Sequence, residues 1–107
     1  MKYKYPKGVD VISGMGGGYE ATCQKMVIAG VEWCDNNKDK NPTFKQYKNI
    51  YGITADENKD MEELQNVMLK ASGNDCTGAM MQATTNHVLY IKKNGWDKYL
   101  KEVLKQE

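Results

Sequence analysis

A glycine-rich segment is the most distinctive candidate for chemistry in this sequence. It reads Gly-Met-Gly-Gly-Gly from Gly14 to Gly18 and leads into a predicted helix that begins near Tyr19. Glycine lets a ligand approach the backbone closely, and the unpaired N–H groups at a helix start attract anions. No Gly-Lys-Ser/Thr and no β-α-β unit accompany it, which excludes a P-loop and a dinucleotide fingerprint. We predict a phosphate site with a stacked ring, and a plain entry loop is the alternative. The predicted ligand-binding residues are Gly14, Gly16, Gly17, Gly18 and Tyr19.

A second small and polar segment, residues 72–78, precedes another predicted helix. Thr77 and Gly78 would offer a hydroxyl and backbone N–H groups to the same ligand, and we predict that they complete its pocket. Helix capping by Thr77 or Asp75 explains the segment equally well, and the carboxylate of Asp75 would repel an anion. Two helix starts of this kind would let a small chain grip a ligand that carries two charged groups.

His87 is the single histidine and the candidate for acid–base or ligand chemistry. It lies on the apolar face of a predicted helix, where a hydrogen-bonded core histidine is the alternative interpretation. Cys76 lies about 16 Å from it along that helix, too far for a nucleophile and its base. Cys23 or Cys34 would have to approach from another helix. We therefore predict a ligand-binding role for His87, no catalytic residue and no metal site.

The charge balance limits the classes of partner. The 107 residues include 15 lysines, no arginine and 14 acidic side chains, so the formal net charge is +1. Duplex nucleic acid usually requires a strong positive excess, and arginine supplies the planar fork that grips phosphates. The longest apolar run, Met26–Val31, is far shorter than the roughly 20 residues that span a bilayer. We expect a cytoplasmic protein with reduced cysteines that binds no duplex nucleic acid, no membrane and no cofactor.

The hydrophobic periodicity predicts an all-α protein, a small bundle of about four to five helices. Residues 1–18 are predicted to form an irregular N-terminal arm that ends in the glycine-rich loop. Residues 19–107 are predicted to form a single helical domain. Within the first helix, over residues 19–36, Gly30 indicates a close approach by another helix.

Local signals bound the remaining predicted helices. Asn41-Pro42 predicts the start of a short helix that ends at Gly52. Asp60 opens a predicted capping box for a helix that ends in Ser-Gly-Asn at residues 72–74. The next helix covers residues 75–94, and Asn94-Gly95 breaks the chain before a final amphipathic helix that begins at Trp96.

Three segments together resemble small proteins carried by bacteriophages and prophages. The segments are residues 12–20, residues 50–53 and the stretch from residues 75–80 to residues 91–96. The arginine-free composition, rich in lysine, asparagine and tyrosine, also suits an AT-rich genome. Small phage proteins often act against host defence, so the resemblance implies capture of a nucleotide immune signal or inhibition of a host protein. It assigns no role to any residue.

These patterns predict a non-enzymatic protein that captures a phosphate-bearing small molecule, a nucleotide immune signal, in a bacterial host cell. We expect a homo-oligomer with the pocket between subunits, because so small a domain has little interior to spare. The first alternative is an inhibitor of a host defence protein that uses an exposed apolar helix face around Trp96 and Tyr99. The second alternative is a small enzyme that uses His87 with a cysteine from another helix.

Overall fold

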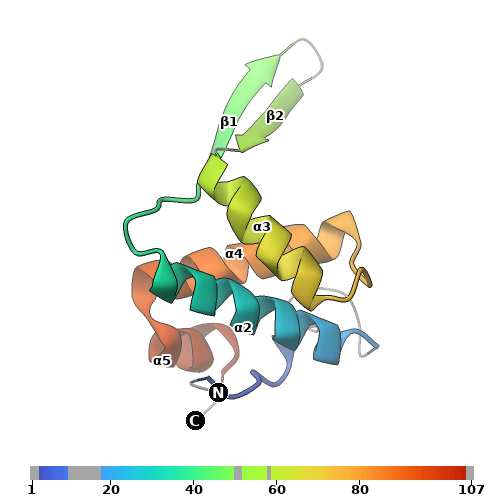
Figure 1. The fold of residues 1–107 in the computed structure, drawn as a ribbon, viewed down its shortest axis with the longest axis vertical. Helices are drawn as coiled ribbons and strands as arrows, with labels where there is room; N and C mark the ends of the chain where they lie inside the picture. Colours follow the sequence, from blue (N-terminus) through green and yellow to red (C-terminus); the bar gives the residue numbers. More distant parts are fainter. Residues whose placement is uncertain (1–2, 10–17, 50–51, 58, 106–107) are drawn as a thin grey trace.

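Helices make up most of the described part of the chain (Figure 1). The computed structural model describes residues 3–9, 18–49, 52–57 and 59–105. In chain order the elements are α2 (Glu20–Asn36), β1 (Phe44–Asn49), β2 (Gly52–Glu57), α3 (Lys59–Ala71), α4 (Gly78–Asn94), α5 (Trp96–Lys98) and the π-helix η1 (Tyr99–Val103). Helices α2, α3 and α4 pack on one another, and α5 and η1 fold back against α4. The predicted small helical bundle is confirmed, and the hairpin of β1 and β2 is added to it.

Helix α2 supplies one face of the core. Its buried residues recur at helical spacing and are Cys23, Met26, Val27, Ile28, Gly30, Val31 and Cys34. A Cβ atom at Gly30 would lie 2.6 Å from Val88 Cγ2 and 3.2 Å from Met68 Sδ. Only glycine therefore lets α3 and α4 come this close to α2, and the predicted close approach at this residue is confirmed.

Helix α3 covers α2 with an apolar stripe and ends where the sequence predicted. The stripe consists of Met61, Leu64 and Met68, all buried. Gly73 and Asn74 both have a φ of 66°, the left-handed conformation that ends helices. The predicted capping box is wrong, because Asp60 lies inside the first turn of α3. Its carboxylate Oδ2 instead accepts the backbone N–H of Asn41 at 3.0 Å.

Helix α4 begins and ends with side-chain and backbone caps. The hydroxyl of Thr77 accepts the N–H of Met80 at 3.2 Å. At the other end, Gly95 has a φ of 96°, and its N–H donates to the carbonyl of Ile91 at 2.7 Å. The glycine turns the chain so that α5 and η1 return along the bundle. The break predicted at residues 94–95 is confirmed.

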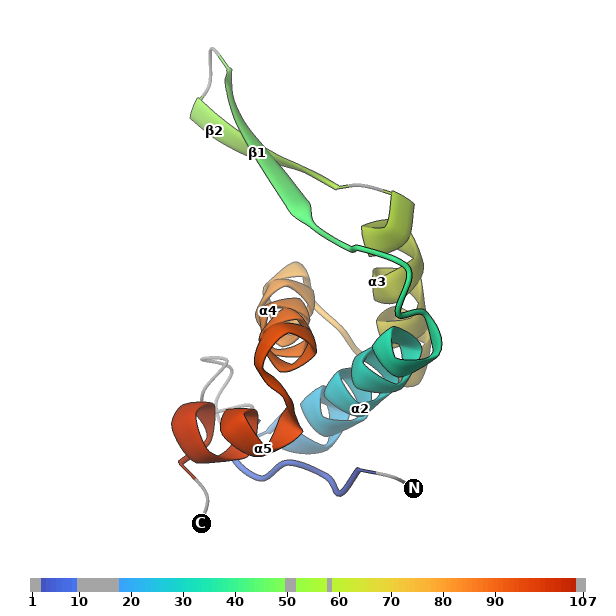
Figure 2. The same cartoon turned by 90° about the vertical axis from the view of Figure 1, so that its left-hand side faces the viewer.

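The short helix predicted after Pro42 is wrong. Strands β1 and β2 form an antiparallel hairpin there, with Phe44 opposite Glu57 and Asn49 opposite Gly52. The segment is rich in aromatic and β-branched residues, which favour strands. Its asparagine and glycine also suit the first and fourth positions of a tight turn. The hairpin projects away from the helical bundle along the longest axis of the molecule (Figure 1, Figure 2).

The described part of the N-terminal arm is irregular and lies along α2 and the C-terminal segment (Figure 2). Its contacts with α2 run antiparallel to that helix: Gly8 N–H donates to Glu20, Gln24 Nε2 donates to Pro6 O at 3.1 Å, and the Tyr3 hydroxyl donates to Asp35. Val9 is fully buried in the core. The arm is therefore fastened to the bundle at both of its described ends.

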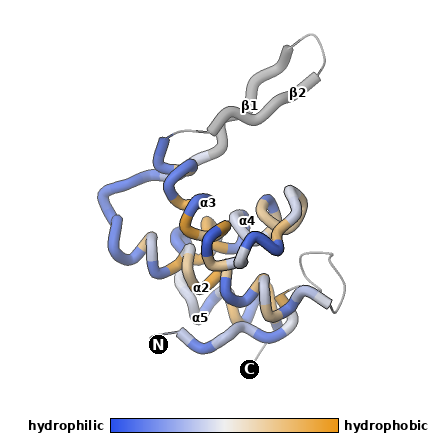
Figure 3. The backbone as a smooth tube through the Cα atoms, turned by 45° about the vertical axis from the view of Figure 1, so that its right-hand side comes forward, coloured by the Kyte–Doolittle hydropathy of each residue, from blue (hydrophilic) through white to orange (hydrophobic). Residues whose placement is uncertain are grey.

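Apolar segments gather where α2, α3 and α4 meet, and the segment between α2 and β1 is hydrophilic (Figure 3). Tyr99 of η1 is fully buried, and Leu104 follows it into the same core. None of the helices that the structure describes is long and apolar enough to cross a membrane.

Candidate functional site

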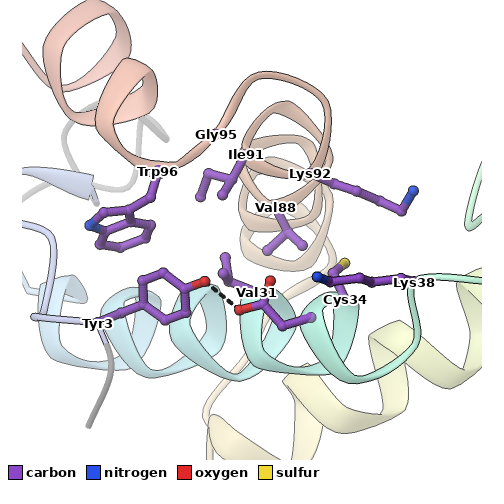
Figure 4. Close-up of a pocket in the computed structure, with 10 residues that line it drawn as sticks. Tyr3, Val31, Cys34, Lys38, Val88, Ile91, Lys92, Gly95 and Trp96 are labelled. Carbon is purple, nitrogen blue, oxygen red and sulfur yellow. Dashed lines mark hydrogen bonds between the residues drawn. The ribbon is translucent and has the colours of Figure 1, made fainter.

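A cavity of about 330 Å³ opens between the C-terminal halves of α2 and α4 (Figure 4). We call it the first cavity. It is lined by Tyr3, Val31, Cys34, Asp35, Lys38, Val88, Ile91, Lys92, Gly95 and Trp96. Pockets that bind small molecules usually measure about 300–1,000 Å³, so this volume suits a compact ligand.

Two aromatic side chains form one end of the first cavity. The rings of Tyr3 and Trp96 have centroids 4.8 Å apart and are tilted by 51°. The Tyr3 hydroxyl donates to Asp35 of α2, which fixes the ring and occupies the carboxylate. Burial, followed by this hydrogen bond, raises the pKa of Tyr3 to about 12, so the hydroxyl stays protonated at neutral pH. The cavity thus offers a fixed aromatic surface for a flat ring.

Two lysines form the opposite end of the first cavity. Lys38 follows the end of α2, and Lys92 belongs to the last turns of α4. Figure 4 shows both lysine side chains on the side of the cavity away from Trp96. Both residues are exposed. No ion pair joins either ammonium group to a carboxylate within the described residues. Stabilisation of the negative helix ends explains their position in part, yet both charges remain available to an anion.

The floor between these two ends is apolar and chemically unreactive. Val31 comes from α2, and Val88 and Ile91 come from α4. Burial raises the pKa of the Cys34 thiol to about 11, although the charge of Lys92 lowers it. The thiol is therefore protonated at neutral pH and packs as a small apolar group instead of acting as a nucleophile.

The predicted glycine-rich site lies only partly within the described residues. Gly14, Gly16 and Gly17 fall outside them. Gly18 is exposed, and Tyr19 keeps 40% of its surface exposed at the N-cap of α2. Ligand binding by these residues stays a prediction.

At the second predicted helix start, a side-chain hydroxyl is already used to cap the helix. Thr77 uses its hydroxyl to cap α4, which agrees with the capping alternative, and Gly78 is exposed. Helices α2 and α4 run in the same direction, so their two starts lie at one end of the bundle (Figure 1). The first cavity lies at the other end, where both helices finish.

His87 is a hydrogen-bonded core residue. Its Nδ1 lies 2.8 Å from the hydroxyl oxygen of Tyr99, and the two rings pack edge-to-face with centroids 5.5 Å apart. Burial lowers the pKa of His87, so the imidazole is neutral at pH 7, and burial raises the pKa of Tyr99. His87 does not line the first cavity. The arrangement agrees with the core alternative for this histidine.

The exposed apolar face predicted around Trp96 and Tyr99 is not formed. Tyr99 is fully buried, and Trp96 is half-buried between Tyr3 and Tyr99, with a centroid 5.7 Å from that of Tyr99. The reason is the turn at Gly95, which folds the last segment back onto the bundle. Of the three cysteines, Cys23 and Cys34 are buried and Cys76 is half-buried.

Sequence reasoning named only Cys34 and Trp96 as functional candidates among the residues of the first cavity, each for another role. Tyr3, Lys38 and Lys92 are distant in the chain and carry no motif. One weak signal was present: aromatic residues flank both ends of the chain, and a lysine falls at or just after the end of two long helices.

Likeness to known proteins adds no further guide to this site. Comparisons of the chain with protein-family models, with curated proteins and with solved structures find no match. The resemblance to small phage proteins stays a prediction. The ligands that the first cavity suits therefore follow from its own residues.

Proposed function

We propose that the protein is a non-enzymatic binding protein that captures a small phosphate-bearing molecule in the first cavity. One observation carries the proposal: the cavity has two aromatic rings at one end, two exposed lysines at the other and an apolar floor between them. A nucleotide has the same layout, with a flat base at one end and a phosphate at the other. Stacking of a base on an aromatic ring contributes about 1–3 kcal/mol.

The electrostatics of the cavity make the lysines necessary. The ends of α2 and α4 carry partial negative charge from their carbonyl groups, and the Asp35 carboxylate lies in the same wall. An anion would be repelled by these groups alone. Lys38 and Lys92 offset them, so affinity should depend strongly on both side chains and should fall as salt rises.

The chemistry of the surrounding residues favours capture over turnover. The Cys34 thiol is protonated at neutral pH, and His87 is buried against Tyr99. A protein of this kind would act by lowering the free concentration of its ligand. Under this proposal the ligand is a nucleotide signal in a bacterial cell, and the protein acts for a phage, as the resemblance implies.

Isothermal titration of the full chain tests the proposal. The panel contains adenosine and guanosine monophosphates, cyclic mononucleotides, and linear and cyclic dinucleotides. We expect saturable binding of at least one member, weakened about tenfold or more by Lys92→Met. The matched control is Lys98→Met, which removes an equally exposed lysine that does not line the cavity.

Two results would count against the proposal. If no member of the panel gives heat, capture of a nucleotide is wrong. If binding survives Lys92→Met but is lost in Gly18→Val, the ligand belongs to the glycine-rich helix start and not to the first cavity. Sedimentation of the protein with and without its ligand shows whether the complex holds one chain or two.

A further inference from the structure

A second cavity adjoins the first and shares a lysine with it. It measures about 540 Å³ and is lined by Asn41, Pro42, Thr43, Leu89, Lys92 and Lys93. Lys92 therefore lines both cavities. In Figure 4 the Lys92 side chain extends away from Trp96, so the two cavities meet at the lysine end of the first.

The wall of the second cavity is fastened in place. The N–H of Asn41 donates to Asp60 Oδ2 of α3 at 3.0 Å. Lys40, next to it, pairs with Glu63 of α3 and lies 5.8 Å from the centre of the Trp33 ring. These contacts tie the segment between α2 and β1 to two helices. The second cavity is accordingly formed before any ligand binds.

The chemistry of the second cavity repeats that of the first in outline. Pro42 and Leu89 give it an apolar surface, and Lys93 lines it as a second lysine in addition to Lys92. Lys92 and Lys93 are both exposed. Lys92 thus lies where the two cavities meet, with Lys38 lining only the first cavity and Lys93 only the second.

We propose that the ligand has two lobes, each with a ring, joined through phosphate. This inference rests on the proposed function and narrows its ligand to the dinucleotide class. One base would lie against Tyr3 and Trp96, and the other would lie on Pro42 and Leu89. The phosphates would lie between them, beside Lys92. A mononucleotide would fill the first cavity and leave the second to water.

Titration with a matched pair of probes tests this inference. The probes are adenosine 5′-monophosphate and the linear dinucleotide pApA, and the guanosine pair is measured in parallel. We expect the dinucleotide to bind about tenfold or more tightly than the monophosphate with the same base. Leu89→Ala should remove most of that advantage, because Leu89 lines the second cavity and not the first.

Two exposed lysines give a control that does not depend on the packing of Leu89. Lys93→Met should weaken dinucleotide binding by up to about fivefold and leave monophosphate binding unchanged. Lys98→Met, equally exposed and outside both cavities, should change neither.

The outcomes separate the inference from the proposal beneath it. If the monophosphate binds as tightly as the dinucleotide and Lys93→Met affects neither, the two-lobed ligand is wrong and the proposed function stands. If the only members of the panel that bind are mononucleotides, the dinucleotide class is again wrong, whereas binding of a cyclic dinucleotide alone would support it. If no nucleotide binds at all, the proposed function itself fails.

Discussion

Trp96 and Tyr99 lie three residues apart, and their rings are neighbours, yet they belong to opposite kinds of site. Trp96 is half-buried beside Tyr3 and forms the wall of an open cavity. Tyr99 is fully buried and holds His87 by a hydrogen bond of 2.8 Å. His87, the residue best suited to acid–base chemistry, is thus buried in the core, and we call its pair with Tyr99 the closed site. The first cavity, built mainly from lysines, aromatic rings and aliphatic side chains, is the open site.

This contrast shows that access decides the role of a side chain more than its type does. An imidazole without access to a ligand serves packing, and burial keeps it neutral. Lysines near a helix end usually serve the helix dipole. At Lys38 and Lys92 they also border a cavity, and that position gives them a second use.

The largest difference we expect between the closed and the open site is in the stability lost on alanine substitution. Tyr99→Ala should lower the free energy of unfolding by about 3–5 kcal/mol, because it removes a fully buried ring and the partner of His87. Trp96→Ala should lower it by about 1–2 kcal/mol, because that ring is half-buried. Urea unfolding followed by circular dichroism measures both, and equal losses would contradict the distinction.

Gly30 lies behind the open site, because the Val88 side chain that it touches also lines the first cavity. Gly30→Ala would place a Cβ atom 2.6 Å from Val88 Cγ2. Overpacking of this kind typically costs about 1–3 kcal/mol, against a helix-propensity gain of about 1 kcal/mol. We expect a net loss of stability of up to about 2 kcal/mol in thermal or urea unfolding.

A double-mutant cycle and a second glycine check that explanation. In a Val88→Ala background the Gly30→Ala change should become nearly neutral, because the obstructing methyl groups are gone. Gly78→Ala is the matched control, since a Cβ atom there meets nothing within 4 Å among the described residues. If Gly30→Ala is as harmless as Gly78→Ala, the close approach of the helices does not depend on glycine.

The helices of the bundle could be predicted because each buries a stripe at helical spacing. Apolar residues three or four positions apart located α2, α3 and α4, and glycines marked the ends of α3 and α4. The hairpin could not be located in the same way. Asn41-Pro42 imitates a helix start, and the N–H of Asn41 is instead taken by Asp60, nineteen residues away.

The first cavity could not be predicted because no local pattern contains it. Tyr3 reaches it from the N-terminal arm, and Trp96 reaches it because Gly95 turns the chain back. Sequence reasoning found the candidates for chemistry, among them His87, but exposure is a property of the packed chain. The core alternatives stated for His87 and Thr77 agree with the packing that the structure shows.

The smallest effect we predict, and the most selective one, is a pH dependence confined to the closed site. Burial lowers the pKa of His87 below its ordinary value of 6.5, so the unfolded chain takes up a proton at a higher pH than the folded protein. The His87 contribution to stability is therefore complete above pH 6.5 and falls as the pH drops below it. Urea unfolding between pH 7.5 and 5.5 should show this loss.

In the His87→Leu variant this pH-dependent loss should disappear, although that variant starts from a lower stability because the Tyr99 hydroxyl loses its partner. Binding at the first cavity should not follow the same curve, since His87 does not line that cavity. A phosphodiester-linked probe keeps the charge of the ligand constant. If binding and stability fell together, with the same midpoint, the open and closed sites would be a single coupled unit.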